Sequence, residues 1–276
     1  NQRVYTYKSS ENSFYEDDFR LDSLSLMKEN FTDVQFINDN GWIISSQGII
    51  LHTRDKGKSW TISKWGDFTL NDLHMIDSRR GFIAADGGIL LSTENGGLDW
   101  SVIDTKDVTM NLKTISFFEN KGIATGTKGR IFISEDAGLT WSIKTKKKKK
   151  RKNKLVDLNA AHFITKNEVW IGGNDGIILH STDGGTTWQQ NKFKEYNYYS
   201  VFFINQNEGF IGGENGIYIH TVNGGTNWKS DTLPAFKINK FIYSESTLWA
   251  IGNGGTIQKT SNNGKSWSGK SGKSFF

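Results

Sequence analysis

One eight-residue pattern occurs six times in this chain and limits what the chain can fold into. It reads Ser or Thr, any residue, Asp or Asn, any residue, Gly, two further residues and Trp, as in residues 181–188. Its copies end at Trp60, Trp100, Trp141, Trp188, Trp228 and Trp267, with spacings of 40, 41, 47, 40 and 39 residues. A repeat of this period is typical of propellers and solenoids, in which one unit cannot bury its apolar face alone and stacks on copies of itself.

The residue types of this pattern, called the box below, predict a tight hairpin turn. The Asp or Asn oxygen is expected to accept backbone N–H groups two residues on, and the glycine to take a positive φ. The tryptophan should bury a large apolar area under the hairpin. Three copies carry Asn, which cannot act as an acid or base, so we predict a structural role for all six. The residues given this role are Asp55, Trp60, Asn95, Trp100, Asp136, Trp141, Asp183, Trp188, Asn223, Trp228, Asn262 and Trp267.

Each unit repeats the same order of strands. A first strand, such as residues 200–204, precedes a second strand, which is centred eighteen residues before the box tryptophan. These centres are Trp42, Phe82, Ile123, Trp170, Phe210 and Trp249. A glycine follows in every copy, twelve residues before the tryptophan, at Gly48, Gly88, Gly129, Gly176, Gly216 and Gly255. A third strand leads into the box and a fourth follows it, so each unit is one antiparallel propeller blade.

The chain is therefore predicted to be an all-β protein, a β-propeller of six four-stranded antiparallel blades in residues 30–276. Residues 1–29 lack the box and are expected to close or extend the ring, which gives seven blades if they form one. At 276 residues, a repeat that closes on itself favours one domain.

The spacing also predicts which turns lie on each side of a blade. Nothing is inserted between the second-strand centre and the box tryptophan, and the extra residues of the third interval follow Trp141. In an antiparallel blade, the box turns then lie on the same side as the turn between the first and second strands, the first hairpin turn. This side is called the box face here. The glycine turns and the connections between blades share the opposite side, here the loop face. We expect partners to bind the loop face, because rigid scaffolds present variable loops to partners.

Composition narrows the class of protein. A mean hydropathy of −0.53, with no apolar run of spanning length, predicts no transmembrane helix. The chain has no cysteine, so it has no disulfide and no thiolate site. The formal net charge is +5, and residues 146–152 alone contribute seven positive charges. The rest of the chain therefore has a net charge of −2. A protein-wide basic field for nucleic acid is therefore not predicted. The start at Asn1 fits a processed exported protein or a shortened chain.

The boxes resemble the Asp-box, or bacterial neuraminidase repeat. The pattern before the box, as in residues 170–176 and 249–255, resembles the photosystem II assembly/stability-factor-like propellers, over about residues 31 to 268. This resemblance implies an exported, non-catalytic scaffold that docks on membrane-protein complexes. The Asp-box itself also occurs in sialidases, other glycoside hydrolases, sorting receptors and assembly factors, so it does not define an activity.

Two groups of residues on the expected loop face are candidate partner contacts. The basic group is Lys128, Arg130, Lys146, Lys147, Lys148, Lys149, Lys150, Arg151 and Lys152. It could bind an acidic protein, anionic lipid headgroups or a polyanionic glycan, or the run could be a solvated loop. The run contains no aromatic residue for stacking on nucleic acid. The aromatic group is Phe193 and Tyr196, which are expected to be exposed between blades four and five.

The residues that an enzyme would need can also be sought in the sequence. A sialidase-like site needs three arginines on one side, but Arg54 and Arg79–Arg80 are predicted on the box face. A two-carboxylate glycosidase could use Asp86, Asp175 and Glu214, although these residues are also ordinary turn residues. His52, His180 and His220 repeat one position before a box, and His74 and His162 share a first-strand position, so no metal is predicted.

We therefore predict a non-enzymatic, extracytoplasmic protein-binding subunit of a membrane-protein assembly, exported as a precursor and without a cofactor. A carbohydrate-active or glycan-binding propeller is the alternative. The sequence does not identify the partner.

Overall fold

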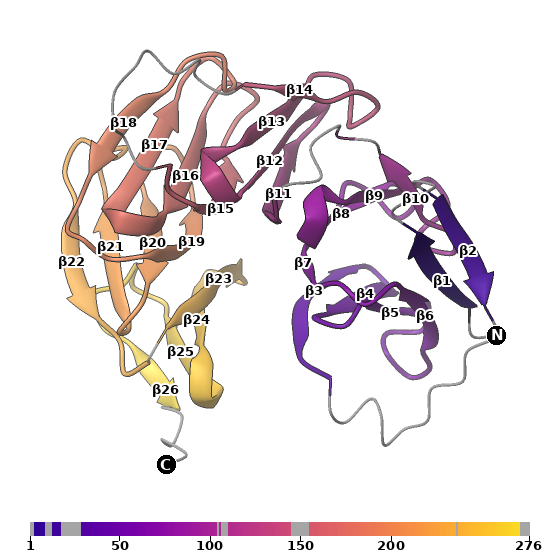
Figure 1. Cartoon of the computed structure of the whole chain (residues 1–276). Coiled ribbons are helices and arrows are strands. Elements are labelled where there is room, and N and C mark those ends of the chain that lie inside the picture. Colours follow the sequence, from indigo (N-terminus) through magenta and orange to yellow (C-terminus); the bar gives the residue numbers. More distant parts are fainter. Residues whose placement is uncertain are drawn as a thin grey trace. The chain divides into compact units, whose positions relative to one another are not determined.

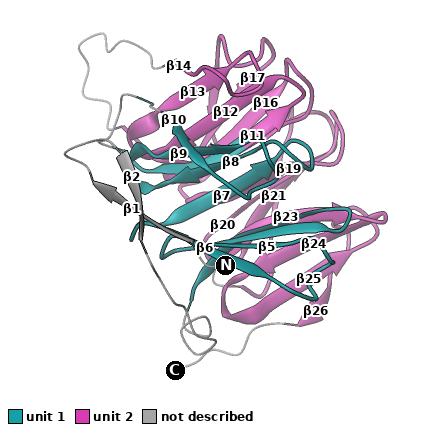
Figure 2. Cartoon of the chain, turned by 90° about the vertical axis from the view of Figure 1, so that its right-hand side faces the viewer, with its two compact units in different colours: residues 1–115 teal, residues 116–276 magenta. Residues whose placement is uncertain are grey.

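The computed structural model describes residues 3–8, 13–17, 29–103, 105, 110–144, 155–235 and 237–270 (Figure 1). For residues 3–8 and 13–17 only the backbone is described. The chain divides into two compact units, Asn1–Ile115 and Ser116–Phe276 (Figure 2). Both units consist of mainly antiparallel sheets, and the described helical segments are short 3₁₀ turns.

The first unit contains two blades. Blade one consists of β3 (Phe31–Ile37), β4 (Asn40–Ser45), β5 (Ile49–Thr53) and β6 (Thr61–Trp65). Blade two consists of β7 (Leu70–Met75), β8 (Gly81–Ala85), β9 (Leu90–Thr93) and β10 (Ser101–Ile103). In blade one, β1 (Arg3–Lys8) pairs in parallel with β6, and β2 (Ser13–Asp17) pairs with β1. The described part of the N-terminal segment therefore extends the first sheet at its outer strand.

The other four blades belong to the second unit, apart from the first residues of β11. Blade three consists of β11 (Leu112–Phe118), β12 (Lys121–Gly126), β13 (Ile131–Ser134) and β14 (Ser142–Ile143). Blade four consists of β15 (Leu158–Phe163), β16 (Val169–Gly173), β17 (Ile177–Ser181) and β18 (Gln189–Lys192). Blade five consists of β19 (Tyr198–Phe203), β20 (Gly209–Gly213), β21 (Ile217–Thr221) and β22 (Lys229–Thr232). Blade six consists of β23 (Ile238–Ser244), β24 (Thr247–Gly252), β25 (Thr256–Thr260) and β26 (Ser268–Lys270). The predicted six four-stranded antiparallel blades of a β-propeller are confirmed.

The glycine twelve residues before each box tryptophan forms the turn between the second and third strands. All six of these glycines have φ between 65° and 78°, in the left-handed region that side chains disfavour. At Gly176 a Cβ would overlap the carbonyl oxygen of Lys194, because the connection to the next blade runs against the turn. Both the backbone angle and this close approach require glycine there.

Backbone hydrogen bonds confirm the predicted sides within the blades. The box amides of Ala137 and Gly184 donate to the first-hairpin carbonyls of Asn120 and Asn167, each over 2.7 Å. On the opposite side, the glycine turn bonds to the connection between blades, as the Gly176 amide does to Tyr196 over 2.7 Å. Box turns thus lie with first-hairpin turns, and glycine turns lie with the connections.

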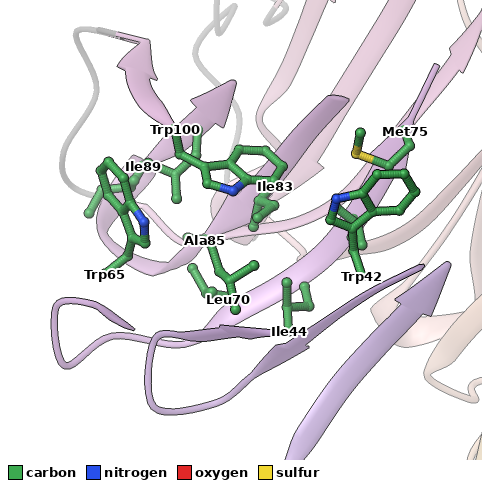
Figure 3. Packing of buried hydrophobic residues seen from close by; sticks show 12 residues of the cluster. Trp42, Ile44, Trp65, Leu70, Met75, Ile83, Ala85, Ile89 and Trp100 are labelled. Atoms are coloured by element: carbon green, nitrogen blue, oxygen red, sulfur yellow. The ribbon is translucent and has the colours of Figure 1, made fainter. Parts of the chain in front are cut away.

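Within each unit, consecutive blades pack face to face through apolar side chains. In the first unit, Trp42, Ile44 and Leu70 are fully buried between blades one and two, together with Ile83 (Figure 3). Full burial of each such side chain stabilises the folded state by about 1.5–3 kcal/mol. The Trp42 indole also donates to the Gly96 carbonyl in the second box, over 2.9 Å.

Side chains of the first strands add polar links between neighbouring blades. The carboxylate of Asp33 accepts the Leu73 amide over 3.1 Å. The hydroxyl of Ser200 likewise accepts the Phe241 amide of the next blade, over 3.0 Å. These bonds satisfy backbone groups at first strands, where each sheet has no further strand of its own.

Candidate interaction surface

The six boxes share one hydrogen-bond network. The hydroxyl at the first position accepts the glycine amide over 2.8–3.0 Å in every copy. The Asp or Asn Oδ1 accepts the amide four residues on, over 2.8–3.0 Å. The prediction that this oxygen bonds two residues on was wrong. The amide two residues after the Asp or Asn is that of the box glycine, and it donates to the first-position hydroxyl instead. The Asp or Asn side chain reaches the amide four residues on.

These contacts lower the pKa values of two box carboxyls. The side-chain and backbone hydrogen bonds from Ser59 lower the pKa of Asp55 to about 2. The corresponding bonds from Thr187 lower the pKa of Asp183 to about 2. Each carboxylate is therefore held ionised as an acceptor for its own turn, and an Asn oxygen accepts the same bond in the three boxes without Asp.

The box tryptophans are less buried than the sequence suggested. Trp100 is buried, whereas the other five are only half-buried. The indoles of Trp60 and Trp141 instead donate to the box glycine carbonyls, over 3.1 and 3.0 Å. Each of these rings thus bonds to its own turn at the rim of a blade, so one side of the indole stays near solvent.

The described part of the basic group lies at the glycine turn of blade three. Lys128 is exposed with φ of 59°, and its amide donates to the Asp157 carboxylate over 3.1 Å. Arg130 follows the turn and is half-buried. Lys146, Lys147, Lys148, Lys149, Lys150, Arg151 and Lys152 lie outside the described residues. Asp157 belongs to the connection that leaves this run, so Lys128 adjoins that connection on the loop face.

Phe193 and Tyr196 are half-buried, not exposed as expected. Both pack against the apolar cluster of blades four and five that contains Trp170 and Tyr198. The Phe193 carbonyl accepts a hydrogen bond from the Tyr198 hydroxyl over 2.6 Å, and the Phe193 amide donates to the Gly176 carbonyl. Their rings help to close the space between the two blades and present only part of their surface to a partner.

Two of the three candidate carboxylates, those of Asp86 and Glu214, accept hydrogen bonds from asparagine side chains. Asp86 accepts the Asn71 side chain over 2.8 Å. Glu214 accepts both the backbone and the side-chain N–H of Asn197, each over 3.1 Å. The Asn197 side chain also accepts the amide of Asp175, over 3.1 Å. Asn197 therefore links the glycine turns of blades four and five, a role that its place in a variable loop did not reveal.

Three histidines repeat one position, as predicted. His52, His180 and His220 stack on Trp42, Trp170 and Phe210, the second-strand residues opposite them, at centroid distances of 5.4, 3.8 and 4.2 Å. His162 contacts the Phe202 ring at 5.0 Å, and burial lowers its pKa to about 4. Within the described ranges, no group of three or more His, Cys, Asp or Glu side chains could hold a metal ion. No helix in that part of the chain is long and apolar enough to cross a membrane.

The fold and its boxes define an Asp-box β-propeller. The model of one family, described as the photosynthesis system II assembly factor YCF48, matches residues 13–67, 103–195 and 152–274. The chain belongs to this family.

Similar proteins agree with that assignment. A stretch of 42 residues is 50% identical to the "Photosystem II assembly lipoprotein Ycf48" of Trichormus variabilis and to that of Nostoc sp.. The stretch makes up 14% of this chain and only 12% of each relative. The structure of YCF48 from Cyanidioschyzon merolae is 14% identical with a TM-score of 0.67, over 87% of this chain and 84% of that one. An ancestral GH74 enzyme is 15% identical with a TM-score of 0.63, over 87% and 37%. At such identities the two structures show a shared fold and not a shared activity.

Proposed function

We propose that this chain is a non-enzymatic assembly factor that binds protein subunits of a membrane complex, with photosystem II as the first candidate. The observation that carries the proposal is the family match over most of the chain. The carboxylates of Asp86 and Glu214 support a non-enzymatic role, because both are engaged in holding turns. The GH74 likeness rests on the fold alone, so it does not favour a glycosidase.

The proposed binding surface is the basic part of the loop face. It comprises Lys128, Arg130 and the run Lys146–Lys152, with Phe193 and Tyr196 as contacts between blades four and five. Lys128 is exposed at the glycine turn of blade three, so its charge is accessible to a partner on the loop face. An acidic protein surface would pair with these cations, and the interaction would weaken as salt screens it.

We propose an extracytoplasmic location for the protein, exported and held at the membrane surface. The support is the name of the two curated relatives, which describes them as lipoproteins. Fractionation of the native organism with an antibody against the chain would test this proposal. Recovery with cytoplasmic markers would contradict it.

The binding role can be tested by affinity capture from solubilised native membranes. The wild-type chain should retain photosystem II subunits at low salt. Lys128→Glu combined with Arg130→Glu should reduce the recovered amount by roughly tenfold, the equivalent of about 1.4 kcal/mol. Lys166→Glu combined with Lys58→Glu, both at exposed box-face positions, changes the net charge equally and should leave recovery unchanged. Equal loss with both variants would reject the loop face as the binding surface, and capture of no membrane subunit would reject the function.

A further inference from the structure

Three departures from the repeat meet at one place on the loop face, where blade three adjoins its connection to blade four. Residues 127–129 form the glycine turn of blade three, and residues 155–157 run beside this turn. The Lys128 amide donates to the Asp157 carboxylate over 3.1 Å, and the Asp157 carbonyl accepts the Asn174 amide of blade four over 2.9 Å. Both blades therefore hold this connection, and all of these residues belong to the second unit.

The first departure is a cation at the turn. Lys128 stands thirteen residues before its box tryptophan and is exposed. The other five copies carry neutral or acidic residues at this position, which are Gln47, Gly87, Asp175, Asn215 and Gly254. The cation is therefore not needed to form a turn of this kind.

The second departure is Arg130, which replaces an isoleucine of the repeat. Ile49, Ile89 and Ile217 at the corresponding position are at most 7% exposed, whereas Arg130 is half-buried. An arginine stem can cover apolar surface while its guanidinium stays in contact with water. Arg130 thus adds a second positive charge close to Lys128.

The third departure is apolar. Leu155 stands three residues before the first strand of blade four, where the other connections between blades carry Asp67, Thr109, Glu195 and Ala235. The side chains of Asp67 and Glu195 are 88% and 82% exposed, so this position lies at the surface of a connection. Leu155 is itself 50% exposed, and its Cδ2 lies 4.0 Å from the place that a Cβ would take at Gly129. One side of the leucine therefore contacts the glycine turn beside Lys128, and the other side is exposed.

The three replacements change the chemistry of one spot without serving the fold. The other blades form the same turn and connection with neutral, acidic or small residues, so the architecture does not require a cation or a leucine there. Residues that break a local rule of the structure are expected at functional sites. Two cations beside an exposed leucine match a partner surface in which carboxylates flank an apolar side chain.

We propose that Lys128, Arg130 and Leu155 bind a segment of a partner protein in which apolar residues alternate with carboxylates. The carboxylates pair with Lys128 and Arg130, and an apolar side chain contacts Leu155. The inference rests on the proposed function, because it assigns a partner chemistry to the loop-face surface and adds Leu155 to its contacts. Cations alone attract any polyanion, whereas the leucine favours a segment that also carries an apolar side chain.

Two labelled peptides of equal charge separate the apolar contact from the charges. One alternates leucine and aspartate, the other alternates serine and aspartate, and fluorescence anisotropy at low salt follows their binding. The wild-type chain should bind the leucine peptide roughly fivefold more tightly, because the exposed half of Leu155 becomes buried. Leu155→Ser should remove this preference and leave binding of the serine peptide unchanged. Lys128→Glu should weaken binding of both peptides by roughly tenfold.

The matched control for Leu155→Ser is Val222→Ser, at an apolar box-face residue that is 65% exposed, and it should alter neither affinity. Equal affinity of the wild-type chain for the two peptides would overturn the inference, as would an equal effect of Leu155→Ser on both. Binding to phosphatidylglycerol vesicles without binding to either peptide would identify a membrane surface instead. Melting temperatures check that each variant is folded. If one is not, Leu155→Thr, which copies Thr109, or Lys128→Gln takes its place.

Capture from solubilised native membranes separates this inference from the proposed function. Leu155→Ser should lower the recovery of membrane subunits by roughly fivefold. Unchanged recovery with Leu155→Ser, together with a loss when Lys128→Glu and Arg130→Glu are combined, would overturn the leucine contact and leave the proposed function in place. Capture of no membrane subunit by the wild-type chain would reject both.

Discussion

The Trp42 indole donates its Nε1–H to the Gly96 carbonyl over 2.9 Å, which joins the second strand of blade one to the box of blade two. The ring is fully buried, and the next box residue, Gly97, lies against it with a φ of 83°. The box is therefore a contact with the preceding blade as well as a turn in its own sheet. Gly225 repeats the arrangement on Trp170, between blades four and five.

Gly97→Ala should destabilise the protein more than Gly57→Ala. Both glycines have φ near 85°, so both variants incur about 1–2 kcal/mol for an alanine in the left-handed region. At Gly97 the added Cβ would also lie 2.6 Å from the Trp42 Nε1, whereas at Gly57 its nearest neighbour is the Trp60 ring at 3.4 Å. Urea unfolding should give an additional loss of about 1–3 kcal/mol for Gly97→Ala. Equal losses would show that the close approach to Trp42 has no energetic effect.

Asp183→Ala should lower the melting temperature, whereas Asp183→Asn should leave it nearly unchanged. Asparagine keeps the Oδ1 that accepts the Thr187 amide over 2.8 Å, as Asn223 does for Asn227 in the next box. Alanine removes the acceptor of both the Thr187 amide and the Thr187 hydroxyl. Differential scanning calorimetry of the three proteins measures the order. An equal fall for both variants would indicate that the negative charge matters, and not the acceptor.

The chain should lose stability in acid between about pH 4 and pH 2. Asp55 and Asp183 have folded-state pKa values of about 2, below the ordinary 3.8. Their contribution is therefore fully present above pH 3.8 and is lost as the pH falls through 2. Unfolding by urea, measured at intervals from pH 5 to pH 2, should show this decline. The double variant Asp55→Asn, Asp183→Asn should show a shallower one, and an unchanged slope would refute the assignment.

His52 should titrate near pH 4 in the folded protein. Burial, followed by the nearby Arg54 charge, lowers its pKa from 6.5 to about 4. The neutral ring on Trp42 therefore stabilises the fold above pH 6.5, and this contribution is lost as the pH falls towards 4. NMR titration of labelled histidines measures the pKa directly. Arg54→Gln should raise the pKa of His52 and leave that of His162 near 4, so a parallel shift of both would contradict the stated cause.

The blades could be predicted because their determinants are local and repeated. The glycine twelve residues before each box tryptophan and the glycine within each box are required by a positive φ, which is a property of one residue. The constant spacing between the second-strand centre and the box tryptophan, as from Trp42 to Trp60 or from Trp249 to Trp267, predicted which turns lie on each side of the blade. The acceptor pattern of the box was missed because the first-position hydroxyl competes for the same amide.

The burial of individual rings was not predictable in this way. Phe193 and Tyr196 lie in the connection between blades four and five, ahead of the core strand, and were therefore expected to be exposed. Hydrogen bonds to Tyr198 and Gly176 instead hold this connection against the blades. Trp170 is buried because the Gly225 turn of the next blade lies on its ring, a contact that the local sequence does not show. Site prediction therefore fails where packing against other elements decides exposure.

In three pairs of consecutive blades, the box glycine of the later blade lies on a ring of the blade before it, so each of these units carries one half of two separate contacts. A newly duplicated forty-residue unit would arrive with a ring on one side and a glycine turn on the other, and both would find their counterparts in the adjoining copies. A duplicated unit would therefore need no new contact residues to pack against the copies on either side of it in the chain.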